Sequence, residues 1–310
     1  MSAQPVKVLY VGGMPRSGTT LLDLMLGELD DHVAVGELFY VWLTGVERDR
    51  LCGCGDPFTQ CPFWSEVGRR AFGGWQAVDL DEVRRLIARV DDSKRVPRLA
   101  LPWSGRAFER DLAKYIELMT SLYRAVASVS GSSVVVDSSK RPSLAYVLRR
   151  APEIDVRVVL LTRDPRGVVN SWQKKVALPE GAGVRNHLKV RPARLMTRRW
   201  LTVNLMVDML GALRVPLVRL RYEDLVTDPE SALQKIVKLW PGAGSQALSF
   251  LTPQGVQLEQ QHTVAGGRVR FHSSPLRLSL DEGWRTELPE RQQRAVSRIT
   301  TPLRRRYGYR

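Results

Sequence analysis

Residues 6–29, VKVLYVGGMPRSGTTLLDLMLGEL, decide the fold because they combine three features in a fixed order. The apolar run from Val6 to Gly13 is typical of a strand that is buried on both faces of a sheet. A glycine-rich loop follows, and from Thr19 onward the apolar residues recur at helical spacing. The backbone N–H groups of such a loop, together with the N-terminus of the helix, surround an anion. This stretch therefore predicts a binding site for phosphate or sulfate.

Further β-branched runs downstream predict more buried strands, and a helical segment at 142–150 separates the first two of them. Buried strands that alternate with helices are typical of a parallel sheet covered by helices. We therefore expect an α/β fold, with a P-loop-type parallel sheet flanked by helices. The additional strands are predicted at residues 133–136, 156–162 and 215–220.

The region 38–130 has a different character, with a cysteine-containing segment and then two helical stretches, 80–90 and 108–126. The apolar stripe of the second stretch indicates packing rather than a ligand site. Because ligands of α/β folds bind at the carboxyl ends of the strands, we expect this region to form a helical insertion over the active site, on the acceptor side. No repeat or linker divides the chain, so residues 1–310 are predicted to form a single domain.

The formal net charge of +15 comes mostly from arginine and implies anionic partners such as phosphates. The stretch Arg185 to Arg199 carries six basic residues and no acidic one. It lacks the interleaved aromatic residues of a single-stranded nucleic-acid site, so we expect no nucleic-acid partner. Apolar runs are too short for a transmembrane segment, and the N-terminus lacks the apolar region of a signal peptide. We therefore expect a cytoplasmic protein.

The three cysteines, Cys52, Cys54 and Cys61, lie within ten residues of one another. An odd, clustered set is unlike the even, dispersed framework of a secreted domain, which also favours the cytoplasm. Three thiols could bind zinc, but no fourth ligand follows at the spacing of a zinc finger. The sequence therefore favours buried thiols or a local disulfide, and we expect no metal in the site.

The phosphate loop departs from that of nucleoside triphosphatases at one telling position. In Gly13 to Thr20, Thr19 stands where those enzymes carry a lysine, and the cation is Arg16, inside the loop. Without that lysine the usual positive charge on the β- and γ-phosphates is lost. This opposes a P-loop kinase or another nucleoside triphosphatase, which is the second candidate function.

The segment Pro15-Arg-Ser-Gly-Thr-Thr20 resembles the phosphosulfate loop P-[KR]-S-G-T-[TS] of sulfotransferases that use 3′-phosphoadenosine 5′-phosphosulfate (PAPS). That family has a second signature, a strand ending in arginine with a serine eight residues later in the next helix, and both bind the 3′-phosphate. Arg163 and Ser171 fit that spacing. Two motifs in the right order make a chance match improbable. The resemblance implies that the donor is bound by Arg16, Ser17, Gly18, Thr19, Thr20, Arg163 and Ser171.

Two weaker resemblances extend along the chain. Arg221-Tyr-Glu-Asp-Leu225 is similar to a segment that follows a core strand in many members, and it implies a donor contact from Tyr222. The segment from His262 to Phe271 resembles the H-x-x-x-G-N-P-x-R-F pattern of bacterial members, whose arginine reaches the 3′-phosphate. Gly and Arg replace the Asn and Pro here, so the contact falls to either Arg268 or Arg270. These similarities imply a bacterial sulfotransferase.

The resemblance implies that a sulfuryl group moves from PAPS to an acceptor hydroxyl by in-line displacement, with release of 3′-phosphoadenosine 5′-phosphate (PAP). Such a transfer needs a base for the acceptor proton and cations around the transferred oxygens. Lys140, after Asp137-Ser-Ser, resembles the catalytic lysine of tyrosylprotein sulfotransferases, and Arg16 is the second cation. Glu37, after a predicted short strand, resembles the base of those enzymes.

Histidine is the base in many sulfotransferases, but no histidine of this chain clearly fits that role. The alternative bases are His32, His187, His262 and His272.

The acceptor is open from sequence: a small molecule, a lipid, a glycan or a peptidyl hydroxyl would each suit, and the basic stretch 185–199 favours an acidic one. The oligomeric state is open as well. A third candidate function is a non-catalytic protein that binds polyanions. The ordered pair of phosphate motifs opposes it, because a general polyanion binder needs neither.

Overall fold

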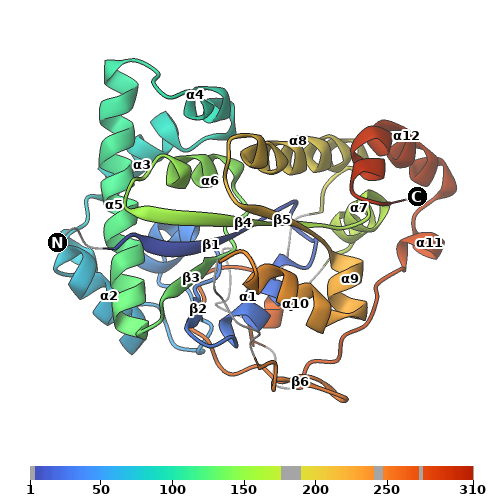
Figure 1. Ribbon diagram of the computed structural model, residues 1–310, viewed down its shortest axis with the longest axis horizontal. Helices are drawn as coiled ribbons and strands as arrows, with labels where there is room; N and C mark the ends of the chain where they lie inside the picture. Colours follow the sequence, from blue (N-terminus) through green and yellow to red (C-terminus); the bar gives the residue numbers. More distant parts are fainter. Residues whose placement is uncertain (1–3, 176–189, 241–246, 272–274, 310) are drawn as a thin grey trace.

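The computed structural model describes residues 4–175, 190–240, 247–271 and 275–309. Five strands form one sheet in the order β2-β3-β1-β4-β5, and every neighbouring pair is parallel. Helices cover both faces (Figure 1). This confirms the predicted α/β fold with a parallel sheet flanked by helices. The strands are β1 (Val6–Gly12), β2 (His32–Ala34), β3 (Val134–Asp137), β4 (Ile154–Thr162) and β5 (Leu217–Arg221).

The central strands are apolar on both faces because each face is covered. Every residue of β3 is buried, as is β1 from Val8 onward. One face packs against α1, α9 and α10, and the other against α5, α6, α7 and α8. The helices outside the region 38–130 are α1 (Thr19–Gly27), α6 (Pro142–Arg149), α7 (Pro165–Gln173), α8 (Ala193–Ala212), α9 (Tyr222–Thr227), α10 (Pro229–Val237), α11 (Trp284–Glu287) and α12 (Glu290–Arg306).

The predicted strands agree with the structure to within two residues at each end. The largest differences are of two residues: β5 begins at Leu217 rather than 215, and β4 begins at Ile154 rather than 156, because β4 pairs along the whole of β1 from Val6 to Gly12. A parallel partner of that length extends the strand beyond its most apolar part.

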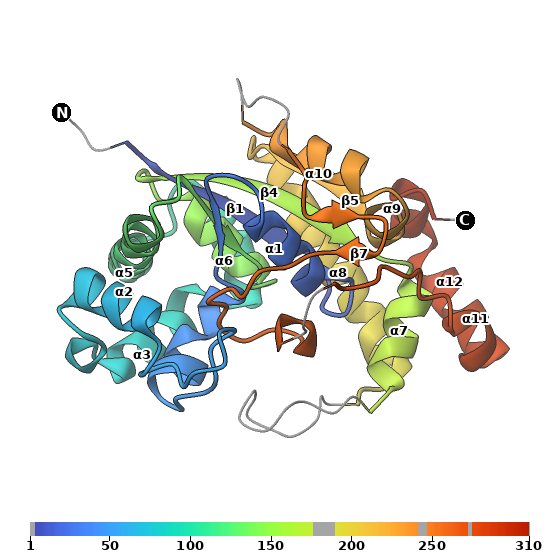
Figure 2. The ribbon, with the colours of Figure 1, turned by 90° about the horizontal axis from the view of Figure 1, so that it is seen from below.

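The region 38–130 is helical, as predicted. The 25-residue helix α5 packs against α2 and α3, and its apolar stripe is buried. Figures 1 and 2 show α2, α3 and α5 together near the N-terminus, at the opposite end of the molecule from α11 and α12. The elements are η1 (Leu38–Tyr40), the π-helical turn η2 (Val41–Val46), α2 (Pro62–Phe72), η3 (Trp75–Ala77), α3 (Leu80–Val90), η4 (Ser93–Arg95), α4 (Val96–Ala100) and α5 (Arg106–Ser130).

The C-terminal part of the chain returns to the free edge of β2. The Val264 N–H donates to the Val35 carbonyl at 2.8 Å, and the Glu37 N–H donates to the Val264 carbonyl at 2.8 Å. This pairing extends the sheet edge just beyond β2 and brings the following residues over the phosphate loop. The small elements of this part are β6 (Leu251–Thr252), β7 (Gly255–Val256) and η5 (Arg268–Phe271).

No helix within the described residues is long and apolar enough to cross a membrane.

Candidate active site

A cavity of about 530 Å³ lies at the carboxyl ends of the central strands, a volume in the range of ligand pockets. The phosphate loop forms its floor, and Gly266, Gly267, Val269 and Leu276 form part of its wall. Among the described lining residues, five are cationic and one, Glu37, is acidic. Such a surplus of positive charge suits a ligand with several anionic groups. The five cations are Arg16, Lys140, Arg163, Arg191 and Arg199.

The phosphate loop connects β1 to α1 and depends on glycine at two points. Gly13 has φ +132°, and a Cβ there would lie 2.2 Å from the Leu161 carbonyl oxygen. Gly18 has φ +86°, and a Cβ there would lie 2.6 Å from the Tyr222 ring. Gly18 is also the N-cap of α1 and provides no side-chain cap, so the first N–H groups of the helix are available to an anion.

Two buried polar atoms of the loop have no partner within the described part of the chain. They are the Ser17 hydroxyl and one guanidinium nitrogen of Arg16. Buried polar groups are normally hydrogen-bonded, so an anion that accepts from them would remove an energetic cost. Arg16 lies 5.0 Å from the centre of the Trp172 ring, whose N–H donates to the Pro15 carbonyl at 3.1 Å. Burial lowers the pKa of Arg16.

Glu37 and Lys140 meet at the cavity wall. The Lys140 Nζ lies 2.7 Å from the Glu37 Oε1, and their side chains are 7% and 16% exposed. Glu37 follows β2 and Lys140 follows β3, and these strands are neighbours in the sheet. The adjacency of the two strands therefore brings a carboxylate and an ammonium group together beside the phosphate loop.

The turn that carries Lys140 is held by the buried carboxylate of Asp137. Its Oδ1 accepts from the Ser139 N–H at 2.7 Å and from the Ser139 hydroxyl at 2.5 Å. The Ser138 N–H donates to the Gly36 carbonyl at 2.8 Å, which attaches this turn to the segment before Glu37. Burial raises the pKa of Asp137 to about 6. The two candidate catalytic groups are thus held by one connected network.

Arg163, directly after β4, lies on the same cavity. Its Nη1 donates to the Arg16 carbonyl at 3.2 Å, and its guanidinium lies 4.6 Å from the centre of the Tyr222 ring. Its Nη2 lies 2.8 Å from a carboxylate oxygen of Asp281. Burial alone would raise the pKa of Asp281, but the hydrogen bond and charge of Arg163 lower it overall. The Asp281 carboxylate therefore already pairs with part of the Arg163 guanidinium, where an anionic ligand would otherwise bind.

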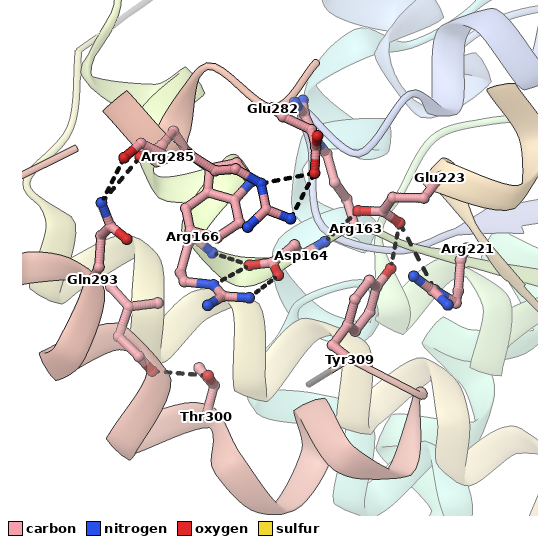
Figure 3. Close-up of polar contacts among 12 residues, drawn as sticks. Arg163, Asp164, Arg166, Arg221, Glu223, Glu282, Arg285, Gln293, Thr300 and Tyr309 are labelled. Carbon is pink, nitrogen blue, oxygen red and sulfur yellow. Dashed lines mark hydrogen bonds and ion pairs between the residues drawn. The ribbon is translucent and has the colours of Figure 1, made fainter. Parts of the chain in front are cut away.

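Glu223 fixes the backbone that follows Arg163 (Figure 3). Its Oε1 accepts from the Asp164 N–H at 3.0 Å, and its Oε2 accepts from the Tyr309 hydroxyl at 2.9 Å. Asp164 in turn caps α7 by accepting from the Arg166 N–H at 2.8 Å. The Arg-Tyr-Glu-Asp-Leu segment therefore has a positioning role that sequence reasoning missed, because the residues that Glu223 contacts are far away in the chain.

Eight of the predicted site residues line the cavity, and Ser17 lies fully buried within the loop beneath it. Ser171, Arg268 and Arg270 are not among the lining residues. Arg268 is exposed, whereas Arg270 is buried and donates to the carbonyls of Thr263 and Leu51. The eight are Arg16, Gly18, Thr19, Thr20, Glu37, Lys140, Arg163 and Tyr222.

The cavity also includes residues that sequence reasoning did not single out. Trp172, Gly266 and Gly267 line it, and the Gly267 N–H donates to the Thr20 hydroxyl at 3.1 Å. Arg191 and Arg199 also line it, and they belong to the basic stretch 185–199, the one sequence feature that pointed to them. The rest of that stretch up to residue 189 lies outside the described residues.

The two described histidines that were alternative bases, His32 and His262, lie away from the cavity lining. His32 lies on β2 and contacts the Asp30 carbonyl, and burial lowers its pKa. His262 packs among the cysteines, and neither of these two lines the cavity. His187 and His272 lie outside the described residues.

The predicted insertion 38–130 contributes none of the lining residues of this cavity, so its role on the acceptor side stays a prediction.

The chain matches the sequence model of the sulfotransferase family over residues 9–240, and it belongs to that family. Among solved structures, the sulfotransferase domain of the curacin biosynthetic pathway is 18% identical, with a TM-score of 0.52 and 99% of each chain covered. The sulfotransferase domain of the Synechococcus PCC 7002 olefin synthase is 18% identical, with a TM-score of 0.49, covering 97% of this chain and 95% of the other. Sulfotransferase STF9 from Mycobacterium avium is 14% identical, with a TM-score of 0.46, covering 99% of this chain and 78% of the other. No curated protein sequence matches significantly.

Proposed function

We propose that this sulfotransferase moves a sulfuryl group from PAPS to an acceptor hydroxyl and releases PAP, with Glu37 as the general base. One observation carries the proposal: the phosphate loop, Arg163 and the Glu37–Lys140 pair line a single cationic cavity. An anion-binding floor, a second cation for another phosphate, and a carboxylate beside the loop are the groups that this transfer needs.

The donor assignment rests on the family and on the anion sites. The 5′-phosphosulfate would accept hydrogen bonds from the uncapped N-terminus of α1, and from the Ser17 hydroxyl and the Arg16 nitrogen that have no partner among the described residues. The 3′-phosphate would bind Arg163 in place of Asp281. Ser171, Arg268 and Arg270 remain candidate contacts to that phosphate.

The proposed chemical step uses Glu37, Lys140 and Arg16. The acceptor oxygen attacks the sulfur in line, its proton passes to a Glu37 carboxylate oxygen, and the bond from sulfur to the bridging phosphate oxygen breaks. Lys140 and Arg16 stabilise the negative charge that develops on the sulfuryl oxygens and the leaving phosphate. These roles for Glu37 and Lys140 are the ones that the resemblance to tyrosylprotein sulfotransferases implies.

Besides the groups assigned to the donor and to catalysis, the cavity is lined by apolar and basic residues. Leu21, Val269 and Leu276 lie on the same lining as Arg191 and Arg199. An acceptor with an apolar body and an anionic group near its hydroxyl fits this combination. We place the reaction in a bacterial cytoplasm, in keeping with the sequence.

Calorimetric titration distinguishes this function from that of a nucleoside triphosphatase. The protein should bind PAP without added magnesium and should bind ATP with Mg²⁺ at least about tenfold more weakly, because the loop lacks the lysine of a triphosphatase. Tighter binding of ATP with Mg²⁺ than of PAP would contradict the proposal.

Arg163→Ala should weaken PAP binding by about 10- to 100-fold, the effect of losing a charge-assisted contact worth roughly 1.5–3 kcal/mol. Adenosine 5′-phosphosulfate, which lacks the 3′-phosphate, should lose little affinity. Ser171→Ala should show the same selectivity with a smaller effect. Asp281→Asn is the matched control with the opposite sign: it removes the competing carboxylate, so PAP should bind more tightly. If Arg163→Ala weakened both nucleotides equally, Arg163 would not be a 3′-phosphate contact.

A further inference from the structure

Outside the cavity, four side chains with metal-binding atoms converge from two distant parts of the chain. They are Cys52, Cys54, Cys61 and His262, and their ligand atoms all lie within 4.8 Å of one another. The Cys61 Sγ is 3.2 Å from the His262 Nδ1, and the Cys52 Sγ is 3.8 Å from it. The Cys54 and Cys61 sulfurs are 3.7 Å apart. His262 is the fourth ligand that the spacing of the cysteine segment did not reveal.

We propose that these four residues bind one structural Zn²⁺ ion. Tetrahedral zinc with Zn–S bonds of about 2.3 Å and Zn–N bonds of about 2.0 Å places its sulfurs about 3.8 Å apart and sulfur and nitrogen about 3.5 Å apart. Three of the six distances in the cluster, 3.2, 3.7 and 3.8 Å, lie within about 0.3 Å of those edges, and the other three are at most 4.8 Å. A disulfide would need sulfurs about 2.05 Å apart, and the three cysteines are free.

The chemistry of the four ligands favours zinc as the metal, and their number favours a structural site. Thiolate and imidazole ligands favour zinc over magnesium or calcium, which prefer oxygen. Four protein ligands complete a tetrahedral shell and leave no open position for a substrate, which is characteristic of structural sites.

The cluster is pre-organised by its surroundings. The His262 ring stacks on Phe63, with centroids 4.9 Å apart and an interplanar angle of 4°. Its carbonyl accepts from the Trp64 indole N–H at 3.0 Å. The Gly53 N–H donates to the Thr263 carbonyl at 3.0 Å, and a Cβ at Gly53 would lie 2.3 Å from the Gln261 carbonyl oxygen. The two ligand-bearing segments therefore pack backbone to backbone, which only glycine permits at this position.

A buried cation complements the charge of the cluster. Three thiolates and one Zn²⁺ leave a net charge of −1. Arg270 is 6% exposed and donates to the carbonyls of Leu51 and Thr263, the neighbours of two ligands, Cys52 and His262. This gives Arg270 a role in supporting the metal site.

The zinc ion would join the insertion to the segment that covers the phosphate loop. Cys61 and His262 are 201 positions apart. Directly after His262, the chain pairs through Val264 with Gly36 and Glu37, and two residues later it reaches the cavity wall at Gly266. The metal would therefore hold that wall in place. The site itself does not depend on the proposed activity.

The test is the zinc content of the full chain, expressed with zinc and purified under reducing conditions, measured by mass spectrometry of the metal. We expect about one zinc per chain for wild type and below about 0.1 for Cys61→Ser and His262→Ala. Control variants are His32→Ala, a histidine outside the cluster, and Glu37→Gln, which should lose activity and keep its zinc.

A second measurement covers the case in which the ligand variants fail to fold. Titration of the wild-type thiols with a mercurial should release the zinc in step with the loss of the three thiols. Substitution with Co²⁺ should produce the absorption of a tetrahedral thiolate complex. Removal of zinc should lower Tm by at least about 5 °C. Wild-type protein without zinc and with three freely reactive thiols, zinc that persists in both ligand variants, or a disulfide within the cluster would each overturn the proposal.

Discussion

Replacing Glu37 by glutamine should lower the turnover of sulfuryl transfer by about 10²–10⁴-fold, the usual effect of losing a general base. The amide has nearly the same shape as the carboxylate but cannot take the acceptor proton. Glu37 is largely buried beside Lys140. It is the only acidic residue among the described residues that line the cavity, so no other carboxylate of this lining can replace it. PAP affinity should change little, since the base acts on the acceptor.

The measurements are kcat from PAPS with a saturating acceptor and the Kd for PAP by calorimetry. Glu230→Gln, an exposed glutamate on α10, is the matched control and should leave both unchanged. A Glu37→Gln enzyme with kcat close to wild type would remove Glu37 from the mechanism. His32 and His262 would then be tested, although both lie off the cavity lining.

Replacing Lys140 by methionine should lower kcat by about 10²–10³-fold, comparable to the loss of a pre-organised donor in a water-excluded site. Methionine keeps much of the aliphatic length and removes the charge, so the sulfuryl oxygens lose a cation in the transition state and Glu37 loses its partner at 2.7 Å. The Kd for PAP should rise by less than about tenfold, because PAP no longer carries the sulfuryl group.

The control for Lys140→Met is Lys94→Met, an exposed lysine on η4 that should behave as wild type. A Lys140→Met enzyme that loses PAP affinity but keeps its kcat would show that Lys140 only binds the nucleotide.

The features of this protein that could be predicted are those that depend on residues close together in the sequence. The strands and the phosphate loop follow from apolar runs and glycine spacing, and Arg163 follows from its place at the end of β4. The resemblance to a family supplied Glu37 and Lys140, but their ion pair depends on β2 and β3 being neighbours, which no local pattern states.

The remaining features depend on contacts between distant segments. Asp281 pairs with Arg163 from 118 residues away, and Glu223 supports Asp164 from 59. Either Arg268 or Arg270 was expected at the 3′-phosphate, and Arg270 donates to the carbonyls of Thr263 and Leu51, the second of them 219 residues away. The fourth member of the cysteine cluster was missed for the same reason: a metal finger spacing describes only ligands that are close in sequence.

The most direct test of the account is transfer of ³⁵S from labelled PAPS to an acceptor, in extracts of the source organism or with purified hydroxyl compounds, followed by mass spectrometry of the product. Wild-type protein, without added magnesium, should produce a labelled product heavier than its acceptor by one SO₃ group, with one PAP released per transfer, and Glu37→Gln should produce almost none. Transfer of a phosphoryl group from ATP with Mg²⁺, in place of any ³⁵S transfer, would contradict the account.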